Sequence, residues 1–297
     1  MMSDANSQSP HPGGLPRWLK RKIPKGNANH FTARLIDELH LATVCDHARC
    51  PNRMECYAQK TATFLILGNV CTRACRFCSV PKGRPQPPDA DEPRRVAAAA
   101  ARLGLSHVVI TCVTRDDLPD GGAGHFVETI AELRRATTAT IEVLPSDFAG
   151  NAAAVDQLLA AGPQVYNHNT ETVPRLYGAV RGRRADYRWT LAMFRRIARQ
   201  APAVKLKTGL MLGLGETTTE LLDTLAELLA AGCRLLTLGQ YLQPSNGQMP
   251  VVRYVPPEEF EQLGEAARHM GFLQVASGPL VRSSYHAREM AAAGSAT

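Results

Sequence analysis

Three cysteines lie close together in the stretch VCTRACRFC, at Cys71, Cys75 and Cys78, with the spacing C-x3-C-x2-C. They follow the apolar run TATFLILG. Three thiolates on so tight a loop can face one cubane of iron and sulfide and ligate three of its four irons. A closed structural zinc site has four protein ligands, whereas a catalytic site keeps an open position. The spacing therefore indicates a metal cluster with one position left for a substrate or cofactor.

A second set of three cysteines, Cys45, Cys50 and Cys56, lies in VCDHARCPNRMECY with the spacing C-x4-C-x5-C, and it is also one ligand short. Two zinc alternatives remain open at this point. The first triplet could form a Cys3His site with His47 or His40, or all six cysteines could share one zinc site. Eight cysteines in a chain without a secretory signal favour metal or redox chemistry over disulfides.

Composition restricts the class of protein. The first 16 residues are polar and lack an apolar signal core, and no run of 18 apolar residues occurs, so we expect a cytoplasmic protein that does not enter a membrane. A formal charge of +7 favours an acidic partner. Only 6% of the residues are aromatic, and they are not interleaved with basic ones, so we expect no nucleic-acid binding.

The elements that must position the cysteines alternate from residue 62 onward, as short apolar runs and helical stretches typical of a parallel sheet. The predicted strands are Thr63–Leu67, His107–Thr111, Thr140–Leu144, Gln164–Asn167, Ala203–Met211 and Leu235–Gly239. The predicted helices between them are Asp91–Leu103, Gly124–Ala136, Ala152–Ala161, Tyr187–Gln200 and Thr218–Ala231. Helical patterns also cover FTARLIDELHL and the stretch after Val255. Three glycines, Gly104, Gly162 and Gly232, suit left-handed caps at helix ends.

Six such units form either a doubly wound sheet or an incomplete barrel. Polar clusters (TRDD, NHN, GLGE and QYLQPS) follow four of the predicted strands, as loops at the carboxyl face of a barrel do. We therefore predict an α/β fold, an incomplete (β/α)6 TIM-type barrel with N- and C-terminal extensions. The predicted division is a flexible basic arm at 1–30, a second-cysteine segment at 31–61, the partial barrel at 62–242 and a C-terminal extension with the sequence RSSY at 243–297.

The first triplet, with Phe77 before its last cysteine, resembles the motif of the radical S-adenosylmethionine (SAM) enzymes. More specifically, both triplets together with TRDDLPDGGA, YNHNTETVPRLY, KTGLMLGLGE, LGQYLQPS and RSSY resemble the lipoyl synthase family over roughly residues 30 to 290. A biotin-synthase-like enzyme, a two-cluster electron carrier and a zinc-stabilised binding module are the competing interpretations.

The resemblance implies two four-iron, four-sulfur (4Fe-4S) clusters and SAM. Cys71, Cys75 and Cys78 would hold the cluster that cleaves SAM. Cys45, Cys50, Cys56 and Ser284, with Ser283 as the rival, would hold an auxiliary cluster that is consumed as the sulfur donor. The implied reaction inserts two sulfurs at C6 and C8 of a protein-bound octanoyl-lysine. The implied partners are octanoylated lipoyl domains of 2-oxoacid dehydrogenase complexes, the glycine cleavage H protein, and a reducing donor such as ferredoxin or flavodoxin.

The same resemblance implies that six residues contact SAM: Phe77, Thr111, Asn167, Asn169, Met211 and Tyr241. Met211 would lie against the adenine, and His168 would point away because side chains alternate along a strand. Lys207 and Arg282 are further candidates to pair with a carboxylate. Cys112 and Thr114 stand where serine and aspartate are more typical of the family. Cys112 and Cys233 belong to neither triplet, and we interpret both as buried small hydrophobes.

Overall fold

The computed structural model describes residues 14–20 and 29–292. Its sheet contains eight strands that follow one another in chain order. The strands are β1 (Ala42–Thr43), β2 (Thr63–Ile66), β3 (His107–Cys112), β4 (Thr140–Leu144), β5 (Val165–Asn167), β6 (Lys205–Leu212), β7 (Leu235–Gln240) and β8 (Gln274–Gly278). The pairs from β2 to β8 are parallel, and β1 pairs antiparallel with β2. Within the described residues β1 and β8 do not pair, so the barrel is unclosed.

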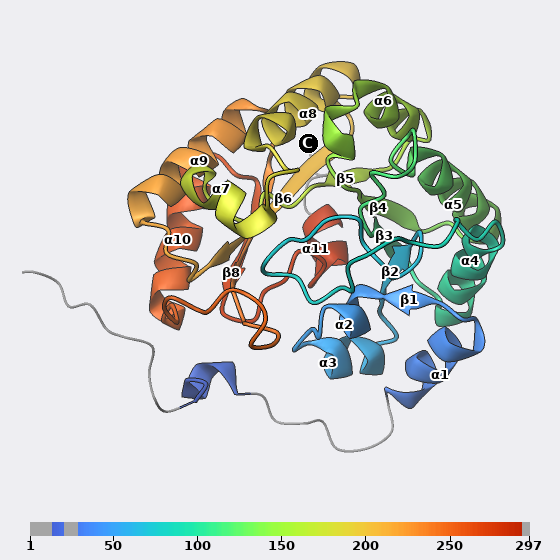
Figure 1. The fold of residues 1–297 in the computed structure, drawn as a ribbon, viewed down its shortest axis with the longest axis horizontal. Helices are drawn as coiled ribbons and strands as arrows, with labels where there is room; N and C mark the ends of the chain where they lie inside the picture. Colours follow the sequence, from blue (N-terminus) through green and yellow to red (C-terminus); the bar gives the residue numbers. More distant parts are fainter. Residues whose placement is uncertain (1–13, 21–28, 293–297) are drawn as a thin grey trace, which may run out of the picture.

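Helices cover the outer side of this curved sheet, as Figure 1 shows for α4, α5, α6, α8, α9 and α10. The helices are α1 (His30–Glu38), α2 (Val44–His47), α3 (Arg53–Ala58), α4 (Glu92–Leu103), α5 (Ala123–Ala136), α6 (Ala152–Ala160), α7 (Pro174–Arg181), α8 (Tyr187–Gln200), α9 (Thr218–Ala230), α10 (Pro257–Met270) and α11 (Ala287–Ala292), with 3-10 turns η1 (Arg17–Leu19) and η2 (Phe148–Gly150). Among the described residues no helix has the length and apolar character needed to cross a membrane.

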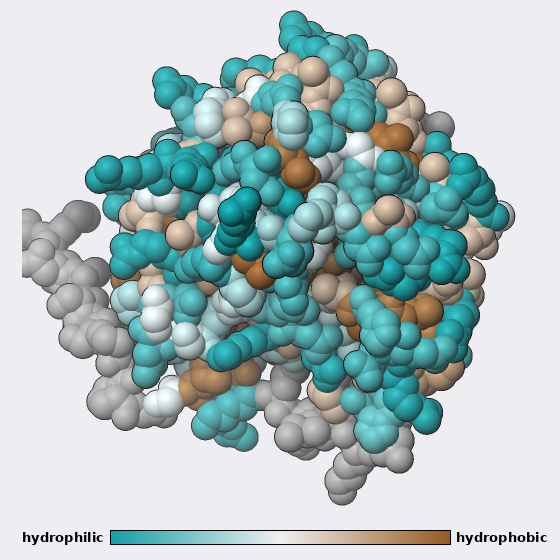
Figure 2. Space-filling view, turned by 45° about the vertical axis from the view of Figure 1, so that its right-hand side comes forward, coloured by the Kyte–Doolittle hydropathy of each residue, from teal (hydrophilic) through white to brown (hydrophobic). Residues whose placement is uncertain are grey.

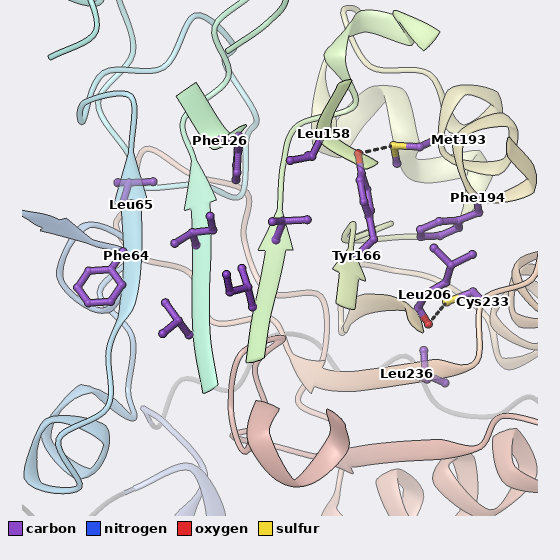
Figure 3. Packing of buried hydrophobic residues seen from close by; sticks show 14 of the residues in the cluster. Phe64, Leu65, Phe126, Leu158, Tyr166, Met193, Phe194, Leu206, Cys233 and Leu236 are labelled. Carbon is purple, nitrogen blue, oxygen red and sulfur yellow. Dashed lines mark hydrogen bonds between the residues drawn. The ribbon is translucent and has the colours of Figure 1, made fainter. Parts of the chain in front are cut away.

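The core lies between the sheet and the outer helices. All four positions of β2 and all six of β7 are buried, as expected of parallel strands covered on both faces. Figure 3 shows the packing of Tyr166 on β5 against Met193 and Phe194 of α8. Cys233 is fully buried there and its thiol donates to the Leu206 carbonyl, which confirms its interpretation as a core residue.

The predicted fold class is confirmed, and the six predicted strands and the helices between them are present with bounds shifted by at most two residues. The three glycine caps are also confirmed, with φ of 67°, 69° and 97° at Gly104, Gly162 and Gly232. Two edge strands were not predicted. β1 has only two residues, and β8 is half-buried at every position, so neither carries an alternating pattern. Most of the predicted basic arm lies outside the described residues.

The visible face of the molecule is mainly hydrophilic, with apolar residues in small separate patches (Figure 2). Trp18 of the basic arm is 43% exposed, while its neighbour Leu19 is buried. This distribution is ordinary for a water-exposed surface. The chemistry must therefore be sought inside the barrel.

A buried polar layer crosses the barrel interior. The Lys207 ammonium donates to both oxygens of Glu142, at 2.9 and 3.2 Å, and the Asn167 amide donates to the same carboxylate at 2.8 Å. The His107 ring lies 3.2 Å from it. Lys207 and Glu142 are completely buried. Burial opposes ionisation of Glu142, but Lys207 and His107 outweigh it and hold the pKa of that carboxyl below its usual value.

We expect Lys207→Met to lower the free energy of unfolding by about 3–5 kcal/mol, because it leaves the Glu142 carboxylate buried without its cation. Arg196→Met is the control, because the Arg196–Asp156 pair lies at the surface, where water screens the charges and removing a pair changes the free energy of unfolding little. Urea unfolding under anaerobic conditions, followed by circular dichroism, measures both. Equal losses in the two variants would contradict this account of the layer.

Candidate functional site

A cavity of about 500 Å³ opens at the carboxyl ends of the strands. Its walls come from the loops after β2, β3, β4, β5 and β7 and from β6 itself, together with α2, α3 and the segment after β8. The lining includes all six triplet cysteines and both serines of RSSY: Cys45, Cys50, Cys56, Cys71, Cys75, Cys78, Ser283 and Ser284. Residues from opposite ends of the chain therefore share one space.

The loop that carries the first triplet is fixed by its backbone. Cys71 N–H donates to the Pro81 carbonyl at 2.8 Å, and Arg76 N–H donates to the Val180 carbonyl at 2.8 Å. The Cys71 sulfur accepts N–H groups from Arg73 and Thr114 at 3.4 and 3.3 Å. Hydrogen bonds to sulfur tune the potential of an iron–sulfur site. Thr114 thus contributes its backbone to this loop, although its side chain departs from the family pattern.

The second triplet lies on two short helices and the turn between them. Cys45 is on α2, Cys50 follows α2, and Cys56 is on α3. A hydrogen-bond network holds the helices together: Tyr57 donates to Asp46 at 2.5 Å, and Arg53 pairs with the same carboxylate. Because Asp46 and Tyr57 are the neighbours of Cys45 and Cys56, the network sets the distance between these two cysteines.

This segment is joined to the C-terminal extension. Asn52 donates to the Leu280 carbonyl at 2.8 Å, and the Tyr285 hydroxyl donates to Glu55 at 3.0 Å. These bonds connect residues more than two hundred positions apart and bring the RSSY sequence to the second triplet. Within it the Ser283 hydroxyl accepts a hydrogen bond from Asn169 at 3.3 Å, which leaves Ser284 as the better candidate for an iron ligand.

The protonation of the cysteines reflects their burial. Burial raises the pKa of Cys45 and of Cys78 to about 11 and raises that of Cys75 as well. A metal deprotonates the thiols that coordinate it. Among the described residues no three His, Cys, Asp or Glu side chains are grouped so as to hold a single metal ion.

Five of the six predicted SAM contacts line the cavity: Phe77, Thr111, Asn169, Met211 and Tyr241. Phe77 and Met211 pack around buried Tyr241, and the Thr111 hydroxyl donates to the Leu144 carbonyl at 2.7 Å. The structure corrects the placement of Asn167, which does not line the cavity. Its amide bonds Glu142 in the polar layer, where Lys207 also lies, while Arg282 does line the cavity.

His168 lies just beyond the end of β5, among the residues around the cavity, and its ring packs edge to face on Phe194 of the outer helix α8, with 6.5 Å between the ring centroids. That its side chain points away from SAM stays a prediction. Its Nδ1 lies 3.1 Å from the Pro145 carbonyl, which can only accept, so Nδ1 carries the proton. Burial, reinforced by Arg181, lowers the pKa of His168 to about 4. The ring is therefore neutral at pH 7.

Three further lining residues were not predicted as site residues: Cys112, Glu171 and Arg181. Cys112 ends β3 at the cavity wall and so is not a pure core residue. Glu171 has a φ of 70°, a left-handed backbone conformation that is uncommon for glutamate and is not predicted from its residue type. Burial raises its pKa, and Arg181 opposes the rise. Arg181 ends α7, a short helix containing Gly178 that periodicity does not reveal.

The residues present fit two iron–sulfur clusters and a cofactor. Each triplet supplies three soft thiol ligands to the cavity, and Ser284 supplies a hydroxyl beside the second. Amide, carboxyl and guanidinium groups line the same space at Asn169, Glu171 and Arg181, as a polar cofactor requires. This is the donor set that the resemblance predicts.

Comparisons with known proteins identify the relatives of this chain. The model of the Radical SAM superfamily matches residues 65–228. "Lipoyl synthase" of Rhodopirellula baltica is 61% identical over 280 residues, which cover 94% of this chain and 89% of that protein. "Lipoyl synthase" of Caldanaerobacter subterraneus subsp. tengcongensis is 52% identical over 272 residues, covering 92% of this chain and 95% of that protein.

Solved structures share the fold at low identity. Streptococcus suis SuiB bound to S-adenosylmethionine superposes with a TM-score of 0.54 at 10% identity, covering 73% of this chain and 50% of that one. HydG, a maturase of the FeFe hydrogenase, has a TM-score of 0.52 at 15% identity, covering 76% of this chain and 61% of that one. With relatives that match over more than 90% of its length, the chain belongs to the lipoyl synthase family within the Radical SAM superfamily.

Proposed function

We propose that this radical SAM enzyme inserts two sulfur atoms at C6 and C8 of a protein-bound octanoyl-lysine to form the lipoyl group. The observation that carries the proposal is the single cavity lined by both cysteine triplets and by Ser283 and Ser284. A hydrogen-abstracting centre and a sulfur donor must both reach two carbons of one chain. A shared cavity allows this without release of the substrate between steps.

Membership of the superfamily implies one 4Fe-4S cluster and SAM. In our proposal Cys71, Cys75 and Cys78 hold that cluster, and Cys45, Cys50, Cys56 and Ser284 hold a second, sacrificial one. When bound, the first cluster and SAM supply hydrogen abstraction from unactivated carbon, and the second cluster supplies sulfur. Thr111 and Asn169 are proposed to bind the polar groups of SAM, and Met211 its adenine, with Phe77 and Tyr241 packed behind.

The apolar part of the lining is suited to the acyl chain. Val44 of α2, Leu65 of β2, Leu210 of β6 and Val113, which follows β3, line the cavity. Burying eight carbons there is favourable by about 0.8 kcal/mol for each methylene. The same side chains exclude water from the reacting carbons. The side chains of this protein thus bind the acyl substrate, orient it between the two triplets and keep water out of the site.

The proposed partners follow from the substrate. They are octanoylated lipoyl domains of 2-oxoacid dehydrogenase complexes, the glycine cleavage H protein, and a reducing donor such as ferredoxin or flavodoxin. The net charge of +7 would speed encounters with acidic partners.

The experiment that tests the function combines metal analysis with turnover. We expect about eight irons per chain after anaerobic reconstitution, because each 4Fe-4S cluster carries four. With SAM, a reductant and an octanoylated lipoyl-domain peptide, we expect 5′-deoxyadenosine and a peptide mass that increases by two sulfurs. Zinc in place of iron, or SAM cleavage without a mass increase, would refute the proposal.

Ser284→Ala is expected to lower sulfur insertion by at least about 100-fold, the upper range for changes around a metal site. Cleavage of SAM should continue, since Ser284 is not assigned to the first triplet. Ser283→Ala is the matched control: it removes only the hydroxyl that accepts from Asn169, and insertion should stay within about tenfold of wild type. Product mass and 5′-deoxyadenosine report the two steps separately. If Ser283→Ala is the more damaging change, the ligand is Ser283.

A further inference from the structure

Arg73 stands between Cys71 and Cys75 on the first cysteine loop, yet its side chain is only 2% exposed. Its Nε and Nη2 donate to the two oxygens of Asp116, each at 2.8 Å. Its Nη1 and Nη2 each lie 2.7 Å from an oxygen of Asp147. One guanidinium therefore forms two fork-like pairs, the geometry in which arginine binds carboxylates most specifically.

The two carboxylates belong to different loops. Asp116 follows β3, and its N–H also bonds the Thr72 hydroxyl of the cysteine loop at 3.1 Å. Asp147 follows β4, is completely buried at its side chain, and caps η2 through the Ala149 N–H at 2.9 Å. Arg73 thus ties the cysteine loop to the carboxyl ends of two strands.

A chain of contacts continues from Asp147 to the cofactor-facing wall. The same loop presents the Pro145 carbonyl to the His168 ring at 3.1 Å, and His168 precedes Asn169. Arg181 donates to the Asn169 carbonyl at 2.7 Å. The Cys75 sulfur lies 3.4 Å from the Arg181 carbonyl, so the series of contacts returns to the cysteine loop. The cysteine loop and the cavity wall at Asn169 therefore depend on each other's position.

We propose that Arg73 is a positioning residue that holds the first cysteine loop in register with the loops after β4 and β5, and so sets where SAM sits relative to the cluster. This rests on the proposed use of SAM at that triplet, but not on the identity of the sulfur acceptor. Lysine cannot replace arginine in this role, because one ammonium cannot serve two carboxylates as a planar fork does.

The test uses the anaerobically reconstituted full chain as wild type, Arg73→Lys, Asp147→Asn and Arg115→Lys. Arg115 is the matched control: its side chain is also 2% exposed and forms a fork with Asp117, and its other bond goes to the Leu67 carbonyl at 3.2 Å, four residues before Cys71, instead of to Asp116 or Asp147. Iron content, the electron paramagnetic resonance spectrum of the reduced protein titrated with SAM, and the KM for SAM in 5′-deoxyadenosine formation are measured.

We expect Arg73→Lys to retain iron but to require at least about tenfold more SAM, both for the spectral change and for half-maximal cleavage, with a smaller change in kcat. Asp147→Asn should shift in the same direction, and Arg115→Lys should match wild type. Unchanged SAM dependence in Arg73→Lys, or an equal shift in Arg115→Lys, would overturn the proposal. Loss of iron from both Arg73→Lys and Asp147→Asn would overturn it in favour of a role in cluster assembly. Wild type that cleaves SAM without forming lipoyl product would refute the proposed function and leave this comparison intact.

Discussion

Replacing Cys75 with alanine is expected to abolish the cleavage of SAM and with it all formation of lipoyl product. Cys75 lines the cavity in the middle of the first triplet, where its sulfur lies 3.4 Å from the Arg181 carbonyl. A cluster held by only three protein ligands cannot lose one of them and still hold SAM in place. Iron should fall from about eight to about four per chain.

The measurement is 5′-deoxyadenosine formation in the same sample as the iron analysis. Cys233→Ala is the control, because Cys233 is buried in the core and contacts the carbonyls of Leu206 and Leu235. It should keep its iron and its activity, with only the modest loss of stability that removing one buried atom causes. Retained SAM cleavage in Cys75→Ala would exclude this triplet as the site of cleavage.

Replacing Cys50 with alanine is expected to abolish sulfur insertion without abolishing the cleavage of SAM. SAM cleavage should persist, whereas the substrate should gain no sulfur. Cys50 lies in the turn between α2 and α3, and its N–H donates to the Cys45 carbonyl at 3.1 Å. The change therefore removes one ligand of the second triplet and leaves the first loop untouched. Iron should again fall to about four per chain.

The two cysteine variants form a crossed comparison. Each should lose about half of the iron, but only Cys75→Ala should lose 5′-deoxyadenosine formation. Substrate mass measures insertion directly in Cys50→Ala. Lipoyl product from that variant would exclude the second triplet as sulfur donor. Loss of both activities in both variants would indicate one shared centre instead of two.

Most of the fold could be predicted from the sequence because its helices and central strands are specified by local periodicity and caps. The strand at Thr140–Leu144 and the helix at Tyr187–Gln200 match their predicted bounds. α7 and β8 could not be found in this way. α7 is short and contains a glycine, and β8 is held in place by its pairing with β7 instead of by any pattern of its own.

Some residues of the candidate site could likewise be predicted from the sequence, and others could not. Cysteine spacing and the family resemblance pointed to both triplets and the serines, and the structure places all eight residues around one cavity. The spacing and the resemblance were not sufficient for Asn167, which was expected to contact SAM but lies in a different layer of the barrel. Asn167 bonds Glu142 in the interior, whereas Asn169, two residues later, lines the cavity. The direction of each side chain depends on where β5 ends, and that is decided by its pairing with β4 and β6.

By itself, the sequence determined the type of chemistry, because ligand type and spacing along a short loop are local properties. It also determined the alternation of strand and helix, through periodicities that span few residues. Only the tertiary structure decided that the second triplet and the RSSY sequence lie in the same cavity as the first, joined by Asn52 and Tyr285. It alone revealed that Arg73 reaches Asp116 and Asp147. Such contacts depend on how the curved sheet brings distant loops together, and no local pattern encodes that curvature.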